Sequence, residues 1–351
     1  MRRATLLLAL VFTACPAPLP APDAGTPDSG LPDAGPVDAG SDAGVDAGCD
    51  GSSVAGLLAC VDQARYRQDL VTVTGVRTPG SAHWQEVQDL CAQRLTSLGF
   101  TVERQAYATG VNVVGVLAGT GLPAERVLVS AHYDSTPNCP GADDNASGVA
   151  GALETARVLA QGQYRRSLVV ACWDEEERGL LGSIAYAAAA RQRAELITSA
   201  FVYEMIGYRS TDAGTQTLPA GLEVIFPGQV AAIHADQDRG DFIALIGDDL
   251  AHQALTRFGV HAQALSLDTV VMELTSAQKG SPQLSQLRRS DHAAFWQQNY
   301  ASLMIGDTAN FRNPNYHCSA GPDAVGDLDH AFAAQVIGAT VGAAADLLEL
   351  R

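Results

Sequence analysis

The chain has few basic residues for its length. Its 351 residues include 22 Lys and Arg against 39 Asp and Glu, which gives a formal net charge of −17 at pH 7. This balance argues against nucleic acid or an anionic membrane surface as a partner, because both repel an acidic protein. Part of the charge lies in an N-terminal segment and part in the acidic clusters described below. Acidity alone therefore says little about the substrate.

Two common catalytic patterns are missing. The glycines from 115 to 121 are not followed by the Gly-Lys-Ser/Thr of a phosphate-binding loop. Ser290, Asp291 and His292 are contiguous, and three contiguous side chains cannot converge on one another as those of a serine-protease triad do. We expect Ser290 to cap a helix that ends near residue 298. Asp291 and His292 are expected to lie around the site described below without contacting the substrate.

Residues 16–50 have almost none of the large apolar side chains that a folded domain needs. Residues 16–50 repeat Pro-Asp-Ala-Gly and Asp-Ala-Gly units, which predicts a disordered tether. Residues 1–15 contain two Arg, an apolar run too short to span a bilayer and a final Thr-Ala-Cys, which indicates an export signal. Its end resembles a bacterial lipoprotein signal, with Cys15 as the lipidated mature N-terminus. Phe12 stands where Leu is more usual, so simple secretion stays open beside a lipoprotein of the cell envelope.

Six further cysteines follow the signal, at positions 49, 60, 91, 139, 172 and 318. An even number in an exported protein is compatible with disulfides. Cys172 lies in an apolar run and is predicted to be a buried thiol. Cys139 and Cys318 each flank a candidate site loop, so a pairing between them is open, but connectivity does not follow from the sequence.

Strand and helix patterns alternate over residues 51–351, which we expect to form a single domain. The expected helices cover 54–73, 82–98, 146–161, 181–195, 249–258, 290–298 and 329–350. The expected strands cover 100–107, 111–117, 126–131, 167–173, 201–206, 241–246, a segment near 270 and 301–305. This alternation predicts an α/β fold, a three-layer sandwich around a mostly parallel mixed sheet with an antiparallel edge.

Polar residues gather where the predicted strands end. His132 and Asp134 follow the strand 126–131, and side chains two positions apart in an extended chain face the same way. A metal-bound histidine usually has a carboxylate on its other ring nitrogen. The run Asp-Asp-Asn at 143–145 holds more polar groups than one helix cap requires. Because α/β proteins bind ligands at the carboxyl ends of their strands, we expect the site at this edge.

The two motifs at 132–135, His-Tyr-Asp-Ser, and at 141–148, Gly-Ala-Asp-Asp-Asn-Ala-Ser-Gly, resemble those of the zinc aminopeptidases of peptidase family M28. The likeness covers most of the chain after about residue 60. It implies a zinc-peptidase domain of phosphorylase/hydrolase-like architecture. It also implies that the substrates are peptides with a free N-terminus, whose first peptide bond is hydrolysed by a metal-bridging water.

The resemblance implies a set of site residues. His132 and His317 match the two metal-binding histidines of the family, and Asp144 matches the acid that bridges two zinc ions. Glu204 stands where many relatives carry Asp, and we expect it to be a metal ligand. His132 and Glu204 would complete one zinc site, while His317 and a glutamate of the acidic run after strand 167–173 would complete the other.

The register of that acidic run is open by one residue. Counting back from Gly-Leu-Leu-Gly-Ser makes Glu176 the general base and Glu177 the metal ligand. Counting from the strand end would make the pair Glu175 and Glu176. We expect the first alignment.

Tyr316 and Asp134 complete the expected site. Tyr316 matches a tyrosine that some secreted bacterial members use to stabilise the tetrahedral intermediate, although the sequence is equally compatible with a packing aromatic. Asp134 is expected to hold the His132 ring through its second nitrogen, and we count it among the catalytic residues. Four carboxylates and a hydroxide carry much more negative charge than one Zn²⁺ can neutralise. We therefore expect two Zn²⁺ per chain, roughly 3.5–4 Å apart.

Two alternatives use the same fold. The glutaminyl cyclase branch binds one zinc and cyclises N-terminal glutamine, as a single-zinc acyltransferase. The other is a non-catalytic binding module, whose known forms have lost metal ligands. Both are disfavoured, because all five ligand positions are kept in this chain. The segment 208–290 is expected to form the pocket for the first residue of the substrate.

We predict that Cys15 is lipidated and that the lipid is the only contact with a membrane. The Arg-Arg start, the apolar run and Thr-Ala-Cys, followed by a tether, fit a surface anchor. Mass spectrometry of the mature protein checks this prediction. An unmodified N-terminus downstream of Cys15 would contradict it.

Overall fold

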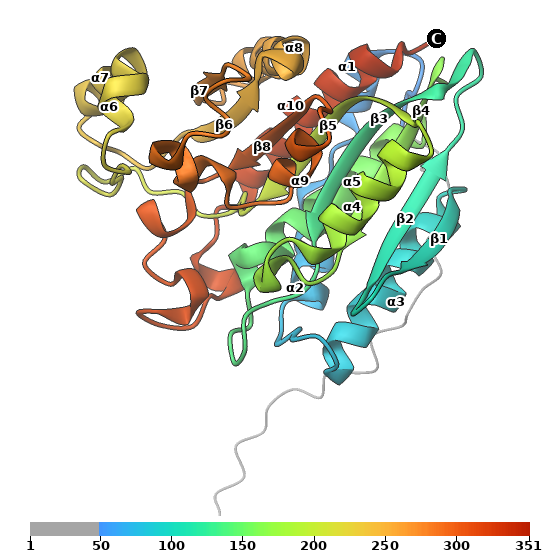
Figure 1. Ribbon diagram of the computed structural model, residues 1–351, viewed down its shortest axis with the longest axis horizontal. Coiled ribbons are helices and arrows are strands. Elements are labelled where there is room, and N and C mark those ends of the chain that lie inside the picture. Colours follow the sequence, from blue (N-terminus) through green and yellow to red (C-terminus); the bar gives the residue numbers. More distant parts are fainter. Residues whose placement is uncertain (1–48) are drawn as a thin grey trace, which may run out of the picture. The chain divides into compact units, whose positions relative to one another are not determined.

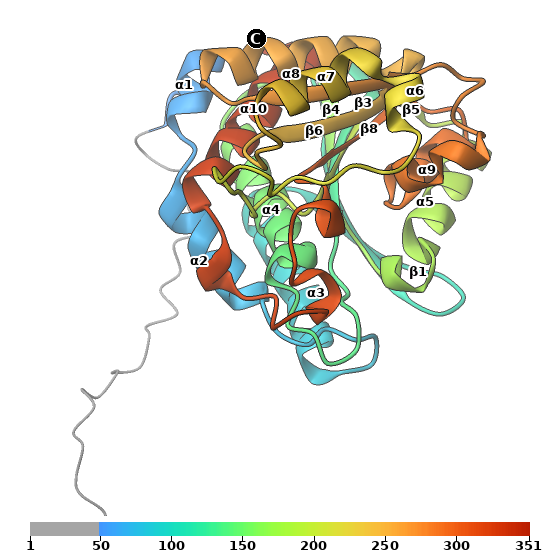
Figure 2. The ribbon, with the colours of Figure 1, turned by 90° about the vertical axis from the view of Figure 1, so that its left-hand side faces the viewer.

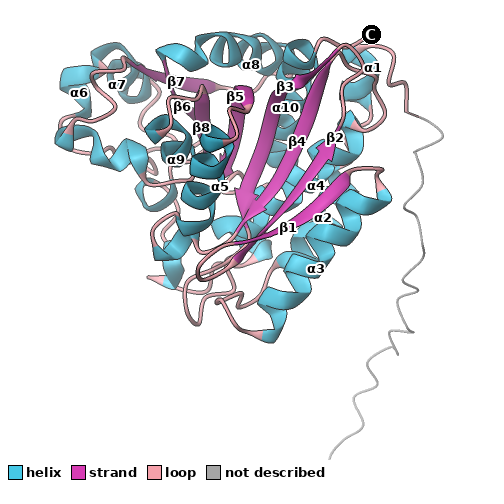
Figure 3. Ribbon diagram, turned by 45° about the vertical axis from the view of Figure 1, so that its right-hand side comes forward, coloured by secondary structure: helices cyan, strands magenta, loops and turns pink. Residues whose placement is uncertain are grey.

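The computed structural model describes residues 49–351, so the predicted export signal and most of the predicted tether lie outside the described residues. Within this range, eight strands form one mixed sheet in the order β1-β2-β4-β3-β5-β8-β6-β7. Figure 3 shows the sheet in magenta with helices on both of its faces. The strands are β1 (Thr101–Ala106), β2 (Val111–Leu117), β3 (Leu122–His132), β4 (Arg166–Trp173), β5 (Leu196–Glu204), β6 (Ile243–Asp248), β7 (Thr269–Leu274) and β8 (Ser302–Gly306).

The α-helices mostly alternate with the strands, as the sequence predicts (Figure 1). They are α1 (Val54–Ala59), α2 (Gln63–Val73), α3 (Ala82–Ser97), α4 (Gly148–Leu159), α5 (Leu181–Gln192), α6 (Leu222–Ile225), α7 (Pro227–Ala235), α8 (His252–Ala264), α9 (His292–Gln297) and α10 (His330–Leu348). The α/β prediction is therefore confirmed.

The direction of the strands decides where the site lies. The four central strands β4, β3, β5 and β8 are parallel, so their carboxyl ends meet at one edge of the sheet. At one side β2 and β1 form the expected antiparallel edge. At the other side β6 pairs antiparallel with β8, and β7 follows β6. This second reversal is not predicted by the sequence analysis.

Alternate residues of the central strands fill cores on opposite faces of the sheet. Val127 and Val129 of β3 lie in the core that contains helices α4 and α10. Leu128 between them lies in the other core, with Tyr186 of α5 and Phe295 of α9. Because these strands are buried on both faces, apolar residues follow one another without a break. The alternation of apolar and polar residues that marks a half-buried strand is therefore absent from this part of the sequence.

Helix α10 is long and apolar enough to cross a membrane by length and composition, but 78% of its apolar window is buried inside the domain. It lies in the largest of the three apolar cores of the described residues. Asp329 caps its first turn by accepting hydrogen bonds from the backbone N–H groups of Ala331 and Phe332. It is therefore a core helix.

Several elements differ in extent from the expectation. The expected helix 54–73 is two helices, because extended Asp62 caps α2 by accepting from the backbone N–H groups of Ala64 and Arg65. The segment 208–240, for which the sequence predicts neither a helix nor a strand, contains the short helices α6 and α7. Figure 2 turns the side that carries these two helices toward the viewer.

Within residues 49–351, disulfides join Cys49 to Cys60 and Cys139 to Cys318. The pairing that the sequence left open is thus present. Cys91 and Cys172 are buried free thiols, which confirms the prediction for Cys172.

Gly306, at the end of β8, pairs with Glu204 of β5, and an added Cβ there would lie 2.4 Å from the Glu204 carbonyl oxygen. We predict that Gly306→Ala lowers the free energy of unfolding by about 1–3 kcal/mol, because the two strands must move apart. Urea denaturation measures the change. The control is Gly259→Ala in α8, where an added Cβ has no described neighbour within 4 Å. It should stabilise the protein by about 0.5–1 kcal/mol, and a similar loss in both variants would contradict the packing argument.

Candidate metal centre

The candidate site lies where the four parallel strands end. His132 is the last residue of β3, and Glu204 is the last residue of β5. The other expected ligands come from the connections that follow β3, β4 and β8, namely Asp144 before α4, Glu177 in the 3-10 turn η2 (Glu176–Arg178) and His317 in the turn η6 (Tyr316–Cys318). The structure brings all five together.

Asp144 lies between two imidazoles. Its Oδ1 is 3.4 Å from Nε2 of His132, and its Oδ2 is 3.1 Å from Nε2 of His317. His132 also faces Oε2 of Glu204 at 3.5 Å, and His317 faces Oε2 of Glu177 at 3.3 Å. One carboxylate therefore separates two groups of donors, each with one histidine and one glutamate.

These donors fit cations. Both oxygens of Asp144 and both ring nitrogens of His132 are buried with no hydrogen-bond partner among the described residues. Buried polar atoms are normally paired, so such a cluster calls for a further ligand. The donor atoms of His132, Glu176 and Glu204 lie within 4.8 Å of one another, and so do those of Asp144, Glu177 and His317. Imidazole and carboxylate are donors that zinc takes in catalytic sites.

Burial and crowding shift the pKa values of these groups. Burial, followed by the charge on Asp144, raises the pKa of Glu177 to about 7. Burial also raises the pKa of Glu176 well above its ordinary value. Burial opposes the charged form of His317, but the carboxylates of Asp144 and Glu177 that face the ring outweigh it and raise the pKa of this imidazole to about 10. Protons and metal ions therefore compete for the same atoms.

Asp134 connects two of the strand ends. Its Oδ1 is 3.3 Å from Nδ1 of His132, so it lies behind the ring, as the sequence predicts. Its carboxylate also accepts hydrogen bonds from the backbone N–H groups of Glu176, at 3.0 Å, and Glu177, at 3.2 Å. This second function, which orients the Glu176–Glu177 turn, is not apparent from the sequence.

Glu175 points away from the donor groups. Its carboxylate accepts hydrogen bonds from the hydroxyls of Tyr107 and Thr109 and from the guanidinium of Arg178. Glu176 and Glu177 each belong to one of the two groups described above. Of the two possible registers, the geometry thus matches the pair Glu176 and Glu177.

The predicted function of Ser290 as a helix cap is wrong. Asp291 occupies the cap position of α9, which begins at His292. The Ser290 hydroxyl instead donates a hydrogen bond to Oε2 of Glu204 at 2.7 Å, so it orients a candidate ligand. His292 donates from Nε2 to the carbonyl of Leu287 at 3.0 Å, behind the site. Local sequence cannot reveal this, because Glu204 is far away along the chain.

Tyr316 lies at the edge of the centre. Its ring stacks on His317 with centroids 3.8 Å apart, and its hydroxyl accepts a hydrogen bond from Arg289 at 2.8 Å. With Glu204 it lines a cavity of about 70 Å³ between the sheet and helices α6 and α7. The apolar lining of this cavity includes Leu222, Ile233, Phe242, Ala244, Ile246, Met272 and Met304.

Arg77 is the main residue that the sequence analysis missed, since it lies in an Arg-Thr-Pro-Gly-Ser turn. Its fully buried guanidinium donates to three backbone carbonyls of the loop after β3, those of Tyr133 at 2.8 Å, Pro140 at 2.7 Å and Gly141 at 2.9 Å. It also donates to two carbonyls at the end of α2 and just after it, those of Val73 at 3.0 Å and Gly75 at 2.8 Å. Burial lowers the pKa of Arg77 to about 10, while the nearby carboxylates of Asp144 and Asp134 oppose this shift. Arg77 thus orients the segment between two candidate site residues and brings positive charge close to both.

Known proteins share this sequence pattern. The family model for peptidase family M28 matches residues 112–243. The uncharacterized protein YfbL of Escherichia coli K12 is 32% identical over 245 residues, which are 65% of this chain and 69% of that protein. A probable zinc metalloprotease of Pyrenophora tritici-repentis is 31% identical over 133 residues, which are 32% of this chain and 28% of that protein.

Solved structures share the fold. The LapA aminopeptidase of Legionella pneumophila superposes with a TM-score of 0.62 at 16% identity, over 84% of this chain and 74% of that chain. A glutaminyl cyclase of Porphyromonas gingivalis superposes with a TM-score of 0.53 at 18% identity, over 85% of this chain and 100% of that chain. At these identities the likeness concerns the fold alone. The family match spans His132 to Glu204, and with the long match to YfbL it identifies the chain as a member of peptidase family M28.

Proposed function

We propose that the protein is a zinc-dependent aminopeptidase that holds two zinc ions per chain. The observation that carries the proposal is the Asp144 carboxylate, which directs one oxygen to each histidine. Two-metal hydrolases use shared ligands of this kind to hold ions a few ångströms apart. His132 and Glu204 would complete one site, and Glu177 and His317 would complete the other.

The charge of the cluster supports two ions. Asp144, Glu176, Glu177 and Glu204 are buried or nearly so, and each would carry a negative charge. Like charges this close cannot all ionise without cations nearby. Two divalent ions neutralise four carboxylates, whereas one neutralises two. A two-metal centre therefore lets all four remain ionised at neutral pH.

The side chains divide the chemistry of peptide hydrolysis among them. Bound zinc would polarise the scissile carbonyl and lower the pKa of a coordinated water. Glu176 would take a proton from the attacking water and pass it to the leaving amine, a task for which a carboxylate ionised beside the bound metal is suited. Asp134 keeps the Glu176 turn and the His132 ring in position. Tyr316, whose oxygen accepts from Arg289, is free to donate its own proton to the developing oxyanion.

The surroundings of the centre support an N-terminal substrate. Glu204 lines the adjoining cavity, and Glu176 lies with it near His132. The negative charge of these two carboxylates favours the ammonium group of a free N-terminus. The cavity next to Glu204 is lined mainly by apolar side chains. Pockets of this kind bind apolar groups. We therefore propose peptides with an apolar first residue as substrates, with no nucleic acid partner and a membrane contact only through a lipid on Cys15.

A glutaminyl cyclase is the second candidate, because the fold is also that of the Porphyromonas gingivalis enzyme. That activity is expected to need a single zinc. The presence of His317 and Glu177 in a second donor group favours the hydrolase. A non-catalytic binding module is disfavoured for the same reason, since no expected ligand is missing.

We predict that the active protein contains two zinc ions per chain and releases nitroaniline from leucyl-nitroanilide faster than from glutamyl-nitroanilide. Elemental analysis and a panel of aminoacyl-nitroanilides measure both quantities. Cyclisation of glutaminyl peptides by protein with a single zinc, without hydrolysis of the panel, would replace the aminopeptidase by the cyclase.

The acidic run allows a sharper test. Glu176→Gln keeps size and hydrogen bonding but cannot accept a proton, so we predict a loss of about 10²- to 10⁴-fold in kcat with zinc retained. Glu177→Gln removes charge from a donor group and should lower zinc content first. The matched control is Glu175→Gln. The Glu175 carboxylate binds Thr109 and Arg178 and not the donor groups, so this variant should leave kcat nearly unchanged. An inactive Glu175→Gln with full zinc, together with a zinc-poor Glu176→Gln, would shift the roles by one residue.

A further inference from the structure

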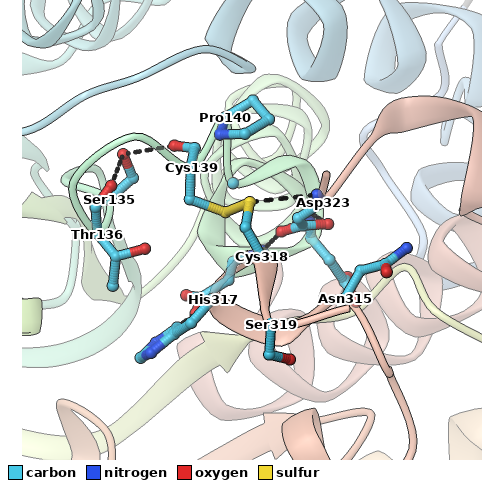
Figure 4. Close-up of a disulfide and its surroundings, with 12 residues drawn as sticks. Ser135, Thr136, Cys139, Pro140, Asn315, His317, Cys318, Ser319 and Asp323 are labelled. Carbon is cyan, nitrogen blue, oxygen red and sulfur yellow. Dashed lines mark hydrogen bonds and ion pairs between the residues drawn. A yellow bond between two sulfur atoms is a disulfide. The ribbon is translucent and has the colours of Figure 1, made fainter. Parts of the chain in front are cut away.

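The turn that carries His317 is attached to the segment that carries Asp144 at two points. The Cys139–Cys318 disulfide is the first, and Cys318 directly follows His317 (Figure 4). Asp323 is the second. Its carboxylate accepts hydrogen bonds from the backbone N–H groups of Asp143, at 3.0 Å, and Asp144, at 2.9 Å. We call the disulfide and the Asp323 carboxylate together the His317 clamp.

The clamp is internally connected. The backbone N–H of Asp323 lies 3.4 Å from Sγ of Cys318, and its carbonyl accepts from the backbone N–H of Ala142 at 3.2 Å. Figure 4 shows Asp323 beside the disulfide, with His317 extending from the same turn as Cys318. The two attachment points thus act on one short piece of chain, and both lead to the segment 139–144.

His317 needs such support more than His132 does. The His317 side chain is 36% exposed, and both it and Cys318 have left-handed backbone conformations, with φ of 52° and 58°. Residues other than glycine keep such conformations only where the surroundings impose them. His132 is the last residue of a central strand, is fully buried and has Asp134 behind its ring. Its position therefore follows from the sheet.

We propose that the His317 clamp sets the metal affinity of the Asp144–Glu177–His317 site, while the His132–Glu204 site forms without it. The inference rests on the two-metal function proposed above. The cysteines and Asp323 are positioning residues in this scheme, because they act through His317 and the backbone of Asp144. It follows that one zinc position depends on a disulfide and the other on the sheet.

The test is zinc binding by the full-length chain, measured by equilibrium titration against a chelator, with no reliance on activity. The variant Cys139→Ser/Cys318→Ser removes the disulfide. We expect the zinc site that His317→Ala removes to lose about 10- to 100-fold in affinity, the range seen when groups that orient a metal ligand are removed. The other zinc site should change by less than about twofold. Cys49→Ser/Cys60→Ser, which removes the disulfide beside α1, is the matched control and should leave both affinities unchanged.

The reference variant is His317→Ala, which separates this inference from the function on which it rests. If His317→Ala still binds two zinc ions with native affinities, the two-metal proposal fails. If His317→Ala loses one zinc and the disulfide variant loses none, only the clamp proposal fails. Equal weakening of both sites in the disulfide variant also overturns it, because the disulfide would then support the whole centre.

A second variant keeps the question answerable if the disulfide variant does not fold. Asp323→Asn retains the disulfide but replaces a charged acceptor of the Asp143 and Asp144 N–H groups by a neutral amide. It should weaken the Asp144–Glu177–His317 site more than the His132–Glu204 site, although both share Asp144, and by less than the loss in His317→Ala. Native affinity at both sites in Asp323→Asn, or equal loss at both, would contradict the clamp.

Discussion

Repulsion among buried carboxylates is the constraint on which this end of the molecule depends. Three acids near the centre each accept hydrogen bonds from a different part of the chain. Asp134 receives two backbone N–H groups of the Glu176 turn, Asp323 receives those of the Asp144 segment, and Glu204 receives the hydroxyl of Ser290. The oxygens of Asp144 have none of these partners. The fold thus satisfies the supporting acids internally and leaves the central one for cations.

The protein itself places one buried positive charge near these acids, the guanidinium of Arg77. Arg77 is buried among backbone carbonyls of the loop that separates His132 from Asp144. It therefore performs two tasks, since it satisfies carbonyls that have no strand or helix to pair with and reduces the field of the acids. A lysine could not do the same, because a single ammonium cannot reach carbonyls on both sides of a loop.

Some of this arrangement follows from sequence and some does not. The pair His132 and Asp134 follows from an extended chain after an apolar run, and the α/β alternation follows from segment lengths. The register of the acidic run needed the family likeness, because three consecutive glutamates look equivalent until Glu175 is seen to bind Thr109 and Arg178. The reversal of β6 and the partner of Ser290 depend on contacts between distant segments. Local patterns carry no information about such contacts.

The reversed pair β6 and β7 gives the adjoining cavity a floor made of strand faces instead of loops. Ala244 and Ile246 line the cavity, whereas Ile243 and Leu245, which alternate with them along β6, belong to the large core on the opposite face. Residues that shape the cavity therefore alternate one by one with residues that stabilise the domain. Gene duplication followed by substitutions at every second position could give enzymes with deeper or shallower pockets on an unchanged backbone, whereas shifting the strand by a single residue would exchange pocket and core at once.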